Sequence, residues 1–502
     1  MNESQPHPRP NRLKQLRAWL FSWRTIRRAL VTLAALITLL ATFYTIENWR
    51  GQRAWEERKH DLIAAGYEMD WNKLIPPAIP DEQNIFKAPH MQEWFVRQGF
   101  SVTGQNDQPP TNFLSTLKHP SQHLFGKESH ITNTTTATDF LAWSEQFETE
   151  FTQIHVALQR PYARIGGDYT RPYEILIPNM VALRNLAQTF AQRAHCHLLL
   201  NQPAAALNDL TFIHAMRKLL LGQPTGKPMT LVAAMIHVAI TGLYTSIIEE
   251  GLQLHAWQEP QLFALESQLA ELNLPGPVYE GLRCELTATS HTFEHEPFDK
   301  LLALSSVVTK ASQASPQKSL LGSWRDWSKG LKLKAYNLAP RGWLFQNLAV
   351  CTSLERMVLE SVRGCQTNIH PKEIKTALDK LQTELERTSL FNLIAKVAIP
   401  NFYKALQTTA RNQTSVNQAR IACALERYHQ AHRQYPDSLA ALRPQFLATI
   451  PNDLIGNQPL KYRHEADGGF TLYSVGWNET DDDGKAAPNL ENGDWIWRSS
   501  AP

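Results

Sequence analysis

The segment 291–295 comes nearest to a catalytic motif in residue type and spacing, because it matches H-x-x-E-H. Histidines four residues apart lie on one face of a helix, where they can bind one zinc ion while the glutamate activates a water molecule. Pro297 ends the helix directly afterwards, and no downstream glutamate stands out as a third zinc ligand. One interpretation of this segment is therefore a zinc-dependent hydrolase acting through His291, Glu294 and His295. The alternative is a polar helix end.

Other residues that could do chemistry are spaced unfavourably. His195 and His197 lie two positions apart, so a helix would point them to different faces and away from a shared metal ion. The pair Gly166-Gly167 lacks the lysine and the serine of a phosphate-binding loop. Nucleotide binding is therefore not supported, and the sequence holds no Gly-x-Ser-x-Gly nucleophile elbow.

The cysteines do not form a recognisable site either. Their number is odd, their spacing is wide, and most lie inside apolar helical patterns without a Cys-x-x-Cys pair. We expect them to be core residues, with one disulfide left open. They are Cys196, Cys284, Cys351, Cys365 and Cys423.

Composition places these residues in a large folded chain. The 502 residues are enough for two or three domains, and 43% apolar with 19% charged residues is ordinary for a globular protein. The net charge is only +3, and seven Lys and Arg residues precede residue 29, so the remainder is slightly acidic. A nucleic-acid-binding ectodomain is not indicated.

An N-terminal membrane anchor is the clearest element. Residues 29–46 carry no charge, and a helix of this length crosses most of a hydrocarbon core of about 30 Å. Basic residues dominate segment 1–28, which predicts that this tail lies in the cytoplasm. We therefore expect the protein in a bacterial inner membrane, with the bulk of the chain outside the cytoplasm. Bulky residues follow the apolar run where a small-x-small cleavage site would lie, so we expect a single-pass anchor rather than a cleaved signal peptide.

Residues 47–137 predict a connection between anchor and body. A juxtamembrane helix is expected from Arg50 to about Ala65. The prolines of Leu74–Pro80 then favour an extended strap, and residues 101–137 have the polar composition of a loop.

Residues 138–411 predict an all-helical body, either a bundle or an irregular solenoid. The stretch Thr230–Ile248 is apolar enough to be a second membrane span, but its internal polar residues and the glutamates that follow favour a buried core helix. The pair Met180–Asn201 and Pro203–Leu221 resembles one tetratricopeptide-type unit without a second copy. Further helices are expected from 138 onward and at 258–272, 276–293, 343–363, 371–387 and 390–410.

Residues 412–502 predict a small α+β module. A helix at Val416–Arg433 is followed by a short helical turn at Ser438–Leu442. The apolar period then changes to two on either side of Asp467-Gly468-Gly469, which is typical of a β-hairpin. The fold class is therefore mainly α with this α+β module at the C-terminus.

The C-terminal module resembles the head of type II secretion major pseudopilins. The shared order is a helix, Tyr435-Pro436, Pro451-Asn452-Asp453, Leu472-Tyr473-Ser474, an Asp-rich loop and a final Gly493-Asp494-Trp495. The chain also resembles a group of large, anchored, uncharacterised bacterial envelope proteins. The pseudopilin resemblance implies calcium at Asp481, Asp482 and Asp483, and the alternative is a solvated acidic loop.

The anchor departs from the pseudopilin pattern. Segment 27–30 lacks the glycine, aromatic and glutamate of a prepilin-peptidase site, and several hundred residues separate the anchor from the module. Assembly into a pseudopilus is therefore not expected.

A second surface feature interleaves tryptophans with cations between Trp324 and Trp343. Such a stretch can rest on an anionic membrane surface or bind a partner. The alternative is a helix whose tryptophans pack inward while Lys329, Lys332 and Lys334 stay solvated.

Taken together, these patterns predict a membrane-anchored, extracytoplasmic interaction or scaffold protein of the bacterial envelope that is not an enzyme. We expect an envelope protein as its partner, an association with secretion, and no nucleic acid. Helical bodies of this kind present concave surfaces to proteins. The alternative function is a zinc-dependent hydrolase or peptidase using His291, Glu294 and His295.

Overall fold

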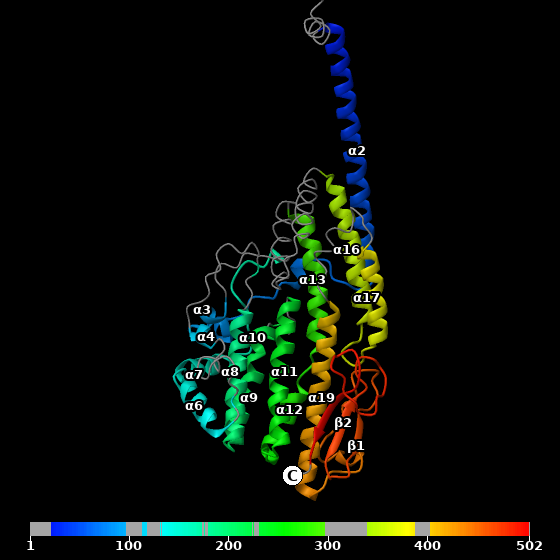
Figure 1. The fold of residues 1–502 in the computed structure, drawn as a ribbon. Helices are drawn as coiled ribbons and strands as arrows, with labels where there is room; N and C mark the ends of the chain where they lie inside the picture. The colour runs from blue at the N-terminus through cyan, green and yellow to red at the C-terminus, as the bar shows by residue number, and fades with distance from the viewer. Residues whose placement is uncertain are drawn as a thin grey trace, which may run out of the picture.

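The computed structural model is mainly helical, with one small antiparallel sheet near the C-terminus (Figure 1). It describes residues 22–96, 113–117, 131, 133–172, 175, 179–222, 224, 230–296, 339–386 and 402–500. Its main helices are α2 (Trp23–Ala64), α6 (Thr134–Glu145), α7 (Glu148–Ala157), α8 (Met180–Leu199), α9 (Pro203–Met216), α11 (Leu231–Gln253), α12 (Glu259–Ala270), α13 (Pro275–His295), α16 (Arg341–Ser361), α17 (Pro371–Glu386) and α19 (Phe402–His432). Shorter ones are η1 (Trp71–Leu74), η2 (Asp81–Gln83), η3 (Ile85–Lys87), α3 (Met91–Phe95), α4 (Phe113–Thr116), α10 (Lys218–Leu221) and η5 (Leu439–Leu442).

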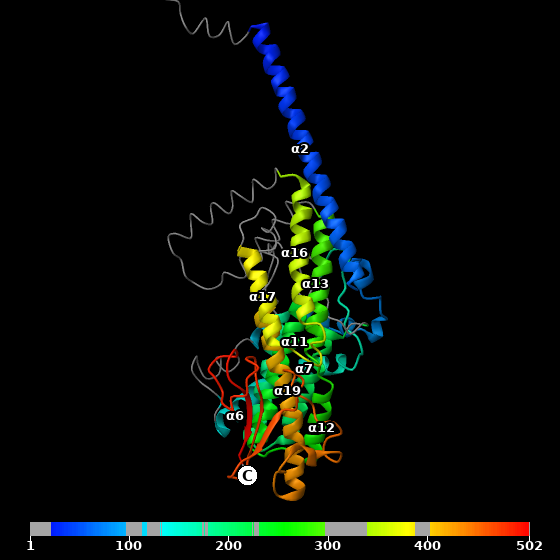
Figure 2. The same ribbon diagram turned by 90° about the vertical axis from the view of Figure 1, so that its right-hand side faces the viewer.

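Helix α2 is a single helix of 42 residues, so the expected anchor and juxtamembrane helix are continuous. Its first half projects from the body (Figures 1 and 2) and is long and apolar enough to cross a membrane, with none of its most apolar window buried. The buried residues of α2 are Glu47, Gly51, Trp55 and Leu62, which all lie in its second half. One helix therefore combines an exposed apolar rod with a core element.

Helix α11 is the second helix that is apolar enough to span a membrane, but 61% of its most apolar window is buried. Val238, Tyr244 and Ile248 are each at most 2% exposed. Helix α11 packs on α8, α13 and α19, as expected of a core helix.

The helix expected from residue 138 onward is two helices rather than one. The α-helical hydrogen bonding stops after Glu145, where the amide N–H of Phe147 donates to the carbonyl of Ser144 in a tight turn. Helix α7 then starts at Glu148. The regular spacing of phenylalanines misled the prediction because Phe147, which begins α7 as its N-cap, and Phe151 inside α7 reach the same core cluster despite the break.

Two core clusters hold the body together. The first joins α8, α9, α11 and α12 to the second half of α19 and to the sheet. The second joins the lower half of α2 to α13, α16, α17 and the first half of α19. Helix α19 belongs to both clusters, and the domain boundary expected at 411/412 falls inside it.

The C-terminal sheet has the strand order β1-β2-β3, formed by β1 (Lys461–His464), β2 (Phe470–Ser474) and β3 (Trp495–Ser499). The predicted hairpin is β1 and β2, which pair in antiparallel register with Lys461 opposite Tyr473. Strand β3 was not predicted, because a five-residue strand after an acidic loop has no hairpin turn of its own to mark it. The sheet packs on α19, where the side-chain amide of Gln418 donates to the carbonyl of Trp495 over 2.7 Å.

Helices α2 and α16 touch backbone to backbone at two glycines. A Cβ atom at Gly51 would lie 1.9 Å from the carbonyl oxygen of Gly342, and a Cβ at Gly342 would lie 1.9 Å from the carbonyl oxygen of Glu47. Carbonyl groups inside helices cannot move aside without breaking hydrogen bonds, so neither position can accept a side chain at this spacing.

Gly51→Ala should therefore destabilise the body by about 1–3 kcal/mol, the usual range for overpacking a filled interior. Thermal unfolding of the full chain in detergent, followed by tryptophan fluorescence, measures the change. Gly166→Ala is the matched control, because the nearest atom to its added Cβ is 3.9 Å away. Equal melting temperatures for the two variants would contradict the close contact of α2 and α16.

Candidate functional site

The junction between the projecting and the buried halves of α2 caps helix α16. The side-chain oxygen of Asn48 accepts a 2.8 Å hydrogen bond from the backbone N–H of Gly342. Glu47 accepts a 2.9 Å hydrogen bond from the indole N–H of Trp343. The residue that precedes α16, Pro340, provides no side-chain cap of its own. Since first-turn N–H groups need acceptors, α2 supplies a cap that the local sequence of α16 lacks.

The glutamate of the H-x-x-E-H segment extends this junction to α13. One oxygen of Glu294 accepts hydrogen bonds from Trp55 Nε1 at 2.6 Å and from Lys59 Nζ at 2.8 Å, and both donors lie on α2. The Glu294 side chain is only 17% exposed. In this arrangement Glu294 fastens the end of α13 to α2, as a polar helix end would, through one oxygen of its carboxylate.

The two histidines of the segment lie against each other. The rings of His291 and His295 stack with centroids 4.2 Å apart, and His295 Nδ1 donates to the carbonyl of His291 over 2.8 Å. Burial, and then the neighbouring His295, lower the pKa of His291. His291 and His295 line an open pocket together with Lys59, Asp70 and Lys73.

Across the described ranges, no three His, Cys, Asp or Glu side chains are grouped as a metal site. His291 and His295 therefore have no third ligand placed beside them there. Zinc binding by this pair stays a prediction.

The acidic loop after β2 distributes its carboxylates among different partners. Asp481 forms an ion pair with Lys461 at 3.3 Å, and Asp483 forms one with Arg463 at 3.2 Å. Asp482 accepts a hydrogen bond from the Asn478 amide at 2.9 Å. The structure thus gives each carboxylate its own protein donor, and calcium binding stays a prediction.

Asp494 organises this loop and was missed as a functional candidate. Its carboxylate is 3% exposed and accepts the backbone N–H groups of Asp482 at 3.2 Å and of Gly484 at 2.7 Å. The Gly-Asp-Trp order was noted only as part of a resemblance. The signal that could have identified Asp494 is an acidic residue directly before the apolar start of β3, Trp495-Ile496-Trp497.

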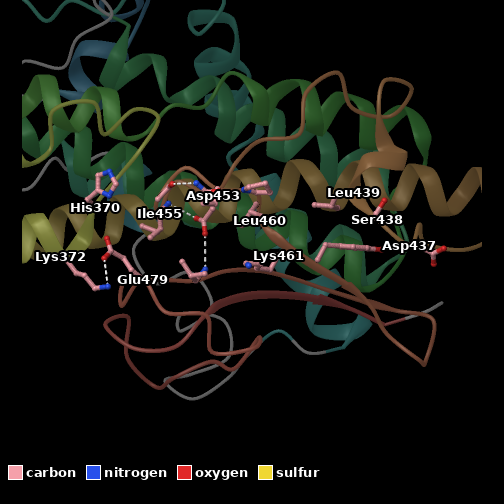
Figure 3. Close-up of a pocket in the computed structure, with 15 residues that line it drawn as sticks. His370, Lys372, Asp437, Ser438, Leu439, Asp453, Ile455, Leu460, Lys461 and Glu479 are labelled. Carbon is pink, nitrogen blue, oxygen red and sulfur yellow. Dashed lines mark hydrogen bonds and ion pairs between the residues drawn. The ribbon is translucent and has the colours of Figure 1, made fainter.

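A groove of about 800 Å³ lies between the start of α17 and the C-terminal module (Figure 3). Its walls include the edge strand β1 and the loop after α19, which are joined by a 2.7 Å hydrogen bond from the Tyr462 hydroxyl to the carbonyl of Pro436. An ion pair of 3.2 Å between Lys372 and Glu479 crosses one end. Asp453 in its floor accepts a hydrogen bond from Ser474 at 2.9 Å and two more from backbone N–H groups. The groove therefore has a mixed lining of apolar, polar and charged side chains, in which Asp453 is a structural residue.

Two carboxyl groups beside the second core cluster were not predicted from the sequence: Glu355 is buried and Glu285 is half-buried. Glu355 on α16 is 6% exposed, with Cys351 Sγ 3.8 Å from one of its oxygens. Glu285 on α13 accepts the backbone N–H of Leu231, the first residue of α11, at 3.2 Å. Burial, and then the charge of Glu285, raise the pKa of Glu355 to about 8. The Glu355 carboxyl is therefore mostly protonated at pH 7.

The remaining candidates have structural roles. His195 contacts Glu250 at 2.5 Å while His197 contacts Gln202 at 2.8 Å, so they face different partners as predicted. All five cysteines are buried and free, which confirms them as core residues.

Most of the Trp324–Trp343 stretch lies outside the described residues. Of its described part, Trp343 is half-buried and packs edge-on against the exposed Phe43 of α2 with ring centroids 6.4 Å apart. Both alternatives for this stretch stay predictions.

Comparison with protein-family models, curated proteins and solved structures gives no match to this chain. The function proposed below rests on the geometry and on the residues themselves.

Glu355→Gln should stabilise the protein increasingly as the pH rises from about 5 to about 8. The pKa of Glu355 in the folded protein, about 8, exceeds the ordinary value of 4.5. The free energy of unfolding of the native chain therefore falls across this window, by at most about 1.4 kcal/mol per pH unit. Below about pH 4.5 the carboxyl is protonated in both states and the substitution should change little. Melting temperatures at pH 5, 6.5 and 8, with exposed Glu373→Gln as control, measure this, and a pH-independent difference would contradict it.

Proposed function

We propose that this chain is a single-pass membrane protein of the bacterial envelope whose extracytoplasmic body acts as a scaffold for a protein partner. The observation that supports this most directly is the continuity of α2, which runs from an exposed apolar half into the core without a break. The proposed span, 29–46, would cover roughly 27 Å at 1.5 Å per residue. The basic residues before it support an N-terminus in the cytoplasm under the positive-inside rule.

A rigid connection to the membrane suits a scaffold. Glu47 lies directly after the proposed span and is already 8% exposed and hydrogen bonded to α16. With no linker between them, a membrane would fix both the height and the orientation of the body. A flexible tether would instead let the body rotate and reach in all directions.

The surface that this geometry presents most plainly is the groove beside β1. The C-terminal sheet lies at the end of the body far from the projecting half of α2 (Figures 1 and 2). The edge strand and the charged rim of the groove suit a soluble envelope protein rather than lipid. An association with secretion is the part of the proposal that rests on the resemblance of this module to pseudopilin heads.

The hydrolase alternative has less support from the geometry. His291 and His295 share an open pocket, but Glu294, which would activate water, is held by Trp55 and Lys59. An enzyme using this segment would first have to release Glu294 from α2.

A crosslinked affinity pull-down of the full-length protein from its native membranes tests the proposal. Mass spectrometry and zinc and calcium analysis are done on the same eluate. The scaffold proposal predicts one envelope protein in stoichiometric amount without zinc. One zinc per chain and no partner, with the zinc lost in a His291→Asn, His295→Asn double variant, would contradict it and support the hydrolase.

A further inference from the structure

His195 connects three segments that are far apart in the sequence. Its Nδ1 lies 2.5 Å from a carboxylate oxygen of Glu250 near the end of α11, and its Nε2 lies 2.9 Å from the backbone carbonyl oxygen of Ile131. His195 itself is on α8, and Ile131 lies two residues before Asn133, which caps the start of α6. The ring of His195 therefore joins the entry of α6 to α8 and α11.

Both contacts of this ring require a proton. A carboxylate and a backbone carbonyl only accept hydrogen bonds, so a proton must lie between each ring nitrogen and its oxygen partner. A neutral imidazole has one N–H group and can satisfy only one of two such oxygens. The arrangement is therefore complete when the ring is protonated, or when the same proton lies on Glu250, and it loses one contact when that proton leaves.

The groups that face His195 leave Glu250 as the charge that governs its proton. Glu250 faces the ring from α11. From the side of α6 the ring meets the carbonyl oxygen of Ile131, and among the described residues no charged side chain of α6 forms an ion pair with it. On α8 itself, burial raises the pKa of the neighbouring Cys196 thiol to about 12, so this thiol stays neutral. His197 faces other partners, Gln202 and Asp209.

The direction of the pH dependence follows from these contacts. The hydrogen bond to Glu250 raises the pKa of His195 above its ordinary value of 6.5, although burial acts in the opposite direction. A histidine with a raised pKa in the folded protein contributes its full stabilisation below the ordinary value, and this contribution is lost as the pH rises through the folded pKa. The His195 side chain is 26% exposed, so it can exchange its proton with solvent.

The start of α6 depends on His195, whereas its end has another attachment. Ile131 packs in a small apolar cluster outside the two main core clusters, and the buried members of this small cluster are Ile131, Ala137, Phe140 and Cys196. At the end of α6, Arg193 Nη1 donates to the hydroxyl oxygen of Ser144 over 3.0 Å. An arginine does not lose its proton in proteins, so this second attachment does not change with pH. Loss of the His195 contact should therefore act on residues 131–140 alone.

We propose that His195 is a pH-sensitive latch, whose protonated ring holds the start of α6 against α8 and α11 and whose deprotonation releases it. The latch is closed at acidic pH and opens as the pH becomes alkaline. Release loosens segment 131–140 over the apolar cluster around Cys196, while the contact of Ser144 with Arg193 keeps the end of α6 in place. The latch is separate from the titration of Glu355, which lies beside the second core cluster.

Hydrogen–deuterium exchange of the full-length protein in detergent at pH 6 and pH 8 tests the latch. Each exchange rate is divided by the rate of an unstructured chain at the same pH, which gives a protection factor that reports local opening. The protection of residues 131–140 should fall at pH 8, by up to about tenfold for each unit by which the folded pKa of His195 exceeds its ordinary value. Residues 141–151 are the internal control and should keep their protection.

Three variants identify the groups responsible. His195→Phe keeps a ring but has no N–H group, so residues 131–140 should be weakly protected at both pH values. Glu250→Gln replaces the carboxylate with an amide, which can donate to Nδ1 of a neutral ring while Nε2–H still reaches Ile131. This variant should therefore keep the segment protected at both pH values. His197→Gln, which removes the neighbouring imidazole, is the matched control and should show the native fall.

Three results would overturn the proposal. Equal protection of residues 131–140 at pH 6 and pH 8 in the native chain would show that the start of α6 does not respond to pH. A fall that persists in His195→Phe would show that another group titrates. A fall in Glu250→Gln as large as in the native chain would show that the carboxylate does not hold the proton of the latch.

Discussion

The contact between α2 and α16 is the constraint on which the rest of the structure depends. Backbone contact at Gly51 and Gly342 brings the helices close enough for Asn48 to accept the backbone N–H of Gly342 and for Glu47 to accept the indole N–H of Trp343. Both residues come directly after the apolar run. Separating the projecting half of α2 from the body would therefore uncap α16 as well as expose buried apolar surface.

Buried polar contacts continue this arrangement through the molecule. Glu294 connects α13 to α2, and Glu285 on α13 accepts a first-turn N–H group of α11. At the far end, the side chain of Gln418 connects α19 to β3. Each link joins segments far apart in sequence, and together they join the two core clusters into one body.

Local patterns in the sequence predicted most helices and the first hairpin. Apolar periodicity located α8, α9 and α11, and the Asp-Gly-Gly turn located β1 and β2. The continuity of α2 was not predicted, because its two halves differ sharply in hydropathy although they form one unbroken helix. The role of Glu294 depends on Trp55 and Lys59, more than two hundred residues away. One sequence on its own carries no signal of such pairings, so it left open both the zinc site and the polar helix end for this segment.

Hydrogen–deuterium exchange across residues 40–60 of the full-length protein in lipid nanodiscs tests the continuity of α2 most directly. If α2 is one helix capping α16, the backbone amides of residues 47–52 should exchange as slowly as those of residues 53–58. Both should be orders of magnitude slower than an unstructured peptide, because the amides are hydrogen bonded in a packed helix. Exchange at the unstructured rate over residues 47–52, between two protected segments, would reveal a hinge and contradict a rigidly held body.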